Sequence, residues 1–133
     1  MKLIGRAIKE GRAEGEALVS HEPLGFFGGV DPETGVVIEP GHELEGHCIA
    51  GTILVFPRGK GSTVGSYTLY RLRKEGLAPA GIINAQSEAV VAVGAIISEI
   101  PMLDSIDLSQ IQTGDEVTIN GDTVEVVRPA RRN

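Results

Sequence analysis

The chain has 133 residues, 18 glycines, one cysteine and a formal net charge of −6. This length suits one domain with an ordinary core, so we expect a single domain over residues 1–133. The negative charge argues against a nucleic-acid surface, and we expect the short basic run at 128–132 to be a frayed end. No stretch resembles a membrane span or a signal peptide, which favours a cytoplasmic protein.

The first third of the chain is typical of short strands joined by glycine-rich turns. We expect strands over residues 2–8, 15–20 and 36–38, with a turn from Asp31 to Gly35. Phe26 and Phe27 stand beside a glycine pair. That segment is either a plain loop with an aromatic plug or a place where backbone approaches a ligand or partner closely.

The centre of the chain predicts a strand, a helix and a second strand. An apolar run over residues 52–56 ends at Pro57, and residues 80–84 form a similar run. Between them a helical pattern places Val64, Tyr67, Thr68 and Leu72 on one stripe and stops at Gly76. This order predicts a right-handed βαβ crossover.

The remaining segments predict a mixed ending. We expect a short helix over residues 87–93, extended segments over 95–97 and 100–102, and an irregular helical turn over 107–112. Two alternating runs around Asn120-Gly121 predict a hairpin with a type I′ turn. The whole pattern indicates a small, β-rich α/β fold.

The loop between the central strand and helix is the candidate site. It contains Arg58, Gly59, Lys60, Gly61, Ser62 and Thr63. Unpaired amides and the dipole at a helix start favour an anionic ligand. Arg58 suits a forked contact with carboxylate or phosphate, and Lys60 offers a point charge; the alternative is a solvated loop. Gly61 separates Lys60 from Ser62, so this loop is not a nucleotide-binding P-loop.

Ser62 has two compatible interpretations. As an N-cap it would satisfy one orphan amide and contribute about 1 kcal/mol. As a base or ligand contact it would be assisted by cations, the helix dipole and a desolvated closed site.

Other polar residues give weaker indications. We expect His21, His42 and His47 to be exposed, because their spacing with Cys48 fits no metal site. Cys48 reads as a small buried hydrophobe. Glu88 is most simply a surface carboxylate at a helix start.

Five segments of the chain resemble those of the aconitase X swivel-domain proteins, and the likeness reaches to about Val127. The segments are Pro57 to Tyr67, Gly28 to Gly35, Gly41 to Leu44, Ala78 to Ala80 and Ile100 to Asp104. Members of this family carry Ala-Glu where this chain has Ser87-Glu88.

The resemblance implies a swivelling β/β/α domain that acts as half of a hydro-lyase. The implied reaction converts (R)-5-phosphomevalonate to trans-anhydromevalonate 5-phosphate in an archaeal mevalonate route to isoprenoids, with Ser62 as proton acceptor. The implied partner is a large aconitase-like subunit, with which the chain forms a heterodimer. That subunit would hold a [4Fe–4S] cluster, since such a cluster needs about three protein thiolates and this chain has one cysteine.

Two alternatives remain open. One is a hydroxyproline-type dehydratase of the same family, which keeps Ser62 as base. The other is a non-catalytic module that binds a phosphorylated metabolite.

Overall fold

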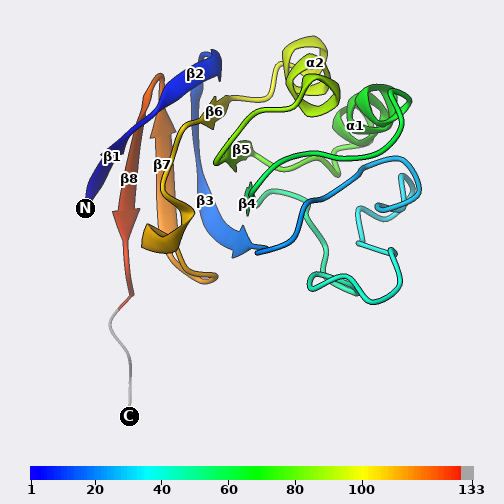
Figure 1. The fold of residues 1–133 in the computed structure, drawn as a ribbon, viewed down its shortest axis with the longest axis horizontal. Helices are drawn as coiled ribbons and strands as arrows, with labels where there is room; N and C mark the ends of the chain where they lie inside the picture. Colours follow the sequence, from blue (N-terminus) through cyan, green and yellow to red (C-terminus); the bar gives the residue numbers. More distant parts are fainter. Residues whose placement is uncertain (130–133) are drawn as a thin grey trace.

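A computed structural model describes residues 1–129, in which eight strands form one sheet and two α-helices cover part of it (Figure 1). In chain order the elements are β1 (Lys2–Ile4), β2 (Arg6–Lys9), β3 (Arg12–Val19), β4 (Ile53–Phe56), α1 (Gly65–Lys74), β5 (Gly81–Asn84), α2 (Ala89–Ser98), β6 (Met102–Asp104), a 3₁₀ turn η1 (Leu108–Gln110), β7 (Glu116–Asn120) and β8 (Thr123–Val127). The long segment between β3 and β4 is irregular, with isolated bridges in place of a strand at 36–38. No helix within residues 1–129 is long and apolar enough to cross a membrane.

The first two strands of the chain, β1 and β2, form the two outer edges of the sheet. The strand order is β1-β8-β7-β3-β4-β5-β6-β2, so the two outer strands are consecutive in the chain. The long strand β3 joins the two halves: residues 12–16 pair antiparallel with β7, and residues 17–19 pair parallel with β4. The result is the β-rich α/β fold that the sequence predicted.

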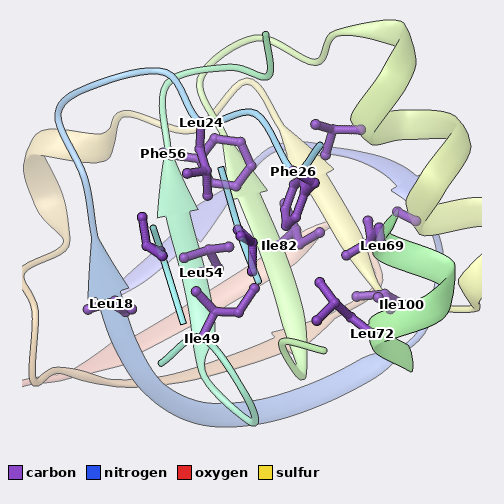
Figure 2. Packing of buried hydrophobic residues seen from close by; sticks show 14 of the residues in the cluster. Leu18, Leu24, Phe26, Ile49, Leu54, Phe56, Leu69, Leu72, Ile82 and Ile100 are labelled. Carbon is purple, nitrogen blue, oxygen red and sulfur yellow. The ribbon is translucent and has the colours of Figure 1, made fainter. Parts of the chain in front are cut away.

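The parallel half contains two βαβ units, β4-α1-β5 and β5-α2-β6. Strand β4 is buried on both faces, which explains its unbroken apolar sequence. Leu54 and Phe56 face the helices, whereas Ile53 and Val55 face the core between the two halves of the sheet. Figure 2 shows Leu69 and Leu72 of α1 pointing toward the helix-side core. Packing on both faces fixes the carboxyl ends of these strands.

Two helix predictions were wrong in detail. Helix α1 buries Gly65, Ser66, Leu69 and Leu72, whereas Val64 and Tyr67 are exposed at 45% and 70%. Helix α2 runs from Ala89 to Ser98, so residues 95–97 are helical rather than extended. Its N-terminal boundary lies two residues later than predicted, because Glu88 occupies the N-cap.

The C-terminal hairpin is confirmed with a different turn. Asn120 pairs with Thr123, so Gly121 and Asp122 form the loop. Only Gly121 of these two has a positive φ, at 63°, which fits a type II′ turn rather than type I′. Arg128, predicted as part of a frayed end, donates to both carboxylate oxygens of Asp115 at 3.0 Å. Residues 130–133 of that basic run lie outside the described residues.

Candidate active site

The candidate loop, residues 57–64, lies at the carboxyl edge of the parallel strands. It follows β4 directly and leads into α1. Ligands of open α/β sheets bind at this edge, where loops from neighbouring strands meet. The loop after β5 lies beside it, because Ala85 and Gln86 both donate their N–H groups to the Pro57 carbonyl at 3.1 Å. Two connections of the sheet are therefore held together at one place.

Gly59 is clamped on two sides. On one side, the residues before and after Gly59 are hydrogen-bonded to the backbone of Leu24. Leu24 N–H donates to the Arg58 carbonyl, and Lys60 N–H donates to the Leu24 carbonyl, each at 3.2 Å. On the other side, a Cβ placed on Gly59 would overlap Val91 and lie 2.5 Å from Glu88 Oε1. Only glycine fits this gap, so the start of the loop is fixed against α2.

The second half of the loop presents free donors. Gly61 has a φ of +92°, which turns the chain toward α1. The N–H groups of Gly61, Ser62 and Thr63 find no acceptor within residues 1–129. These three residues are exposed and lie directly before the positive end of α1, an arrangement that suits a carboxylate or phosphate oxygen.

Ser62 is exposed and caps the turn that precedes the helix. Its Oγ accepts a hydrogen bond from Val64 N–H at 3.1 Å, and its carbonyl accepts one from Gly65 N–H at 2.9 Å. The helix N-cap itself is Val64, which has no side-chain capping bond. Ser62 therefore does cap a backbone N–H group, as predicted, but in the turn before the helix and not at the helix N-cap. A donor aimed at Oγ also favours an ionised hydroxyl.

The two cations of the loop differ in their environment. Arg58 is exposed, and within the described part of the chain its guanidinium has no hydrogen-bonded or ionic partner. Lys60 Nζ lies 2.9 Å from Glu39 Oε2 in a half-exposed ion pair. Nothing in the sequence pattern of the irregular segment indicated Glu39 as this partner. Arg58 is thus available to a ligand at once, while Lys60 must share its donors.

Glu88 is the N-cap of helix α2. Its carboxylate accepts N–H bonds from Val90 at 3.0 Å and Val91 at 3.2 Å, and so caps α2. The same carboxylate lies against Gly59. Glu88 therefore links the start of α2 to the candidate loop.

Sequence analysis missed the pairing of Arg6 with Asp104. Arg6 contacts both carboxylate oxygens at 3.0 and 2.7 Å, and Ser87 N–H donates to Asp104 Oδ2 at 3.0 Å. Asp104 is buried, with 2% of its surface exposed. The fork from Arg6 is the main reason that the pKa of this carboxyl lies well below its usual range. An acidic residue directly after the apolar Met102-Leu103 pair was the available signal for this anchor of the loop after β5.

His21 and His47 are exposed as predicted, whereas the predictions for His42 and Cys48 were wrong. His42 is buried: its Nε2 lies 2.9 Å from the Pro23 carbonyl, and its Nδ1 accepts Leu44 N–H at 3.0 Å. These bonds satisfy a neutral ring and hold the irregular segment together. Cys48, predicted to be buried, is exposed.

The residues of this chain do not fit an iron–sulfur cluster. Residues 1–129 contain no group of three or more His, Cys, Asp or Glu side chains that could hold a metal ion. The whole chain has one cysteine, whereas a [4Fe–4S] cluster takes about three thiolates from protein.

Comparison with known proteins identifies the family. Residues 2–127 match the family model for the aconitase X swivel domain. The phosphomevalonate dehydratase small subunit of Thermococcus kodakarensis is 56% identical over 126 residues, covering 95% of each chain. The protein of the same name from Methanosarcina acetivorans is 52% identical and covers 97% of this chain and 93% of its own.

Solved structures agree with these sequence relatives. The crystal structure of Thermococcus kodakaraensis aconitase X in its holo-form superposes with a TM-score of 0.94 at 53% identity, covering 96% of this chain and 99% of that one. The solution structure of a UPF0107 protein superposes with a TM-score of 0.87 at 50% identity, covering 96% of this chain and 100% of that one. The chain belongs to the aconitase X swivel-domain family.

Proposed function

We propose that this chain is the small subunit of a hydro-lyase that converts (R)-5-phosphomevalonate to trans-anhydromevalonate 5-phosphate. Full-length similarity to proteins named phosphomevalonate dehydratase small subunit supports this substrate. The geometry that carries the proposal is the exposed Ser62 hydroxyl beside the free N–H groups of residues 61–63. Such a loop supplies a proton acceptor and an anion cradle, but no complete catalytic set.

The role we assign to Ser62 is proton removal. Dehydration of a β-hydroxy acid breaks the C–H bond next to the carboxylate, and that electron pair forms the new C=C bond as the hydroxyl on the neighbouring carbon leaves. Ionised Ser62 Oγ takes the proton, and the departing oxygen leaves as water after gaining a proton. The Val64 N–H bond at 3.1 Å and the α1 dipole favour the ionised hydroxyl.

The neighbouring groups bind and orient the substrate. Arg58 offers a fork to a carboxylate or phosphate, and the amides of residues 61–63 donate to the charge that develops as the proton leaves. Lys60 contributes a second positive charge beside them. Gly59 permits the close packing that fixes the loop in this geometry.

We assign the remainder of the site to a large aconitase-like subunit. Ser62 is exposed in the isolated chain, where bulk water screens its attraction to the nearby N–H groups and cations, so these groups favour an ionised hydroxyl only weakly. A partner that closes over the loop would exclude this water and supply the groups that bind the leaving hydroxyl. Any [4Fe–4S] cluster belongs to that partner in this proposal, because this chain has one cysteine.

The test is an assay of the reconstituted pair. The chain is co-expressed with the large subunit encoded by the same genome, purified without oxygen and incubated with (R)-5-phosphomevalonate. We expect mass spectrometry to show loss of one water, and NMR to show a vinylic proton next to the carboxylate. An assembled pair that leaves phosphomevalonate intact but dehydrates a hydroxyproline contradicts the substrate assignment. A chain that binds phosphorylated metabolites and assembles with no large subunit contradicts the enzymatic role.

A further inference from the structure

Of the eleven exposed large apolar side chains in residues 1–129, six lie beside the candidate loop. Two neighbouring hollows contain these six, and Tyr67 lines both. Tyr67 is 70% exposed and Phe27 58% exposed, and contiguous exposed apolar patches mark interaction sites. We call this surface the apolar face and define it by Phe27, Ile38, Val64, Tyr67, Val93 and Ile97.

The composition of the apolar face is that of an interface core. The two hollows are lined by one charged residue, Arg71. The centres of protein interfaces are depleted in charge and enriched in Tyr, Phe and Arg. The core of this chain does not need these side chains, because α1 buries Leu69 and Leu72 against the sheet instead.

The apolar face continues directly from the candidate loop. Thr63 lines the hollow beside α2, and Val64 lines the hollow beside Phe27. A protein that covers residues 61–63 from outside must therefore also meet Tyr67, one turn further along α1. Figure 1 shows both helices on one flank of the molecule, with their outer sides uncovered.

We infer that the apolar face is the surface on which the large subunit docks, with Tyr67 as its central anchor. The inference rests on the proposed function, in which the large subunit closes over Ser62. A standard interface uses about 20–30 residues a side. Fifteen exposed or half-buried residues line the two hollows or lie among residues 58–61, which is half or more of that number.

The test measures association without substrate. The purified large subunit is titrated with wild-type chain, Tyr67→Asp and Val93→Asp by isothermal calorimetry. We expect each variant to bind at least about 30-fold more weakly, as for a central interface residue. Ile4→Asp is the matched control, because Ile4 is 71% exposed but lies on β1, which pairs with β8 on the side of the molecule opposite the helices (Figure 1). Circular dichroism checks that every variant is folded.

The outcomes separate the two proposals. Wild-type affinity in folded Tyr67→Asp and Val93→Asp, or an equal loss in Ile4→Asp, overturns the docking surface. An isolated chain that dimerises through Tyr67 while its aspartate variant still binds the large subunit also overturns it. A pair that assembles through Tyr67 but does not dehydrate phosphomevalonate supports the docking surface and contradicts the proposed function alone.

Discussion

Replacing Gly59 by alanine should displace the candidate loop by a distance that the structure defines. The added Cβ would lie 2.5 Å from Glu88 Oε1, about 1 Å short of the ordinary contact range of 3.4–4 Å, and would overlap Val91 as well. Because Glu88 is held by two N–H bonds at the start of α2, the loop must give way instead. Overpacking of this kind costs about 1–3 kcal/mol of stability. A displacement of about 1 Å at reacting groups costs on the order of 10²-fold in rate.

The assay compares turnover and stability in the assembled pair. We expect Gly59→Ala to lower kcat about 10²-fold. Gly15→Ala serves as the control for destabilisation, because its Cβ would lie 2.9 Å from the Gly51 carbonyl oxygen at a position in β3 away from the loop. That control should lose similar stability in urea but keep its kcat. A folded Gly59→Ala variant with kcat within a few-fold of wild type would refute the clamped-loop reasoning.

Three further predictions follow from individual side chains. Lys60→Ala should raise KM for phosphomevalonate, and an unchanged KM would show that Lys60 does not bind the substrate. The free energy of unfolding should change by less than about 1 kcal/mol, because the ion pair between Lys60 and Glu39 is partly exposed. Asp104→Asn should lower the free energy of unfolding by about 1–3 kcal/mol at neutral pH, because it weakens the paired hydrogen bonds from the Arg6 guanidinium. Since the folded-state pKa of Asp104 is lowered, its stabilisation is present above the unfolded value near 3.9 and is lost as pH falls below it; urea midpoints should therefore decline less on acidification in the variant. Cys48 should react with a thiol reagent in the native chain at the rate of an exposed cysteine, and protection until unfolding would contradict its exposure.

The parallel core was predictable because its sequence signals were local. The apolar run before Pro57, the glycine at residue 76 and the second apolar run each mark an element boundary that the structure confirms. The hairpin was equally clear from Asn120-Gly121, although the register moved the loop by one residue. These segments need little long-range information to define them.

The errors arose where apolar residues face outward. Helix α2 is apolar on several sides, so its sequence shows little helical periodicity and residues 95–97 looked extended. Val64 and Tyr67 were placed on one stripe with Leu72, which is buried, because hydrophobicity alone cannot distinguish a core face from an exposed one. Both errors fall on the helix surfaces that carry the apolar face.

The position of the candidate loop between a strand and a helix was predictable, but the contacts that support the loop were not. Sequence analysis gave Arg58, Lys60 and Ser62 from their position between a strand and a helix. Contacts from distant segments, including Leu24 to Gly59 and Glu39 to Lys60, depend on the path of the irregular segment, which has no periodic pattern. The hydrogen bonds between the His42 ring and the backbone of that segment could not be predicted for the same reason.

The most direct test of the account is the turnover of an assembled pair that carries Ser62→Ala. If Ser62 takes the proton, kcat should fall at least about 10²-fold while assembly with the large subunit and KM stay close to wild type. Ser109→Ala, an exposed serine in η1, should turn over normally. Turnover of Ser62→Ala within a few-fold of wild type would show that another group removes the proton, and would reduce Ser62 to the cap of its turn.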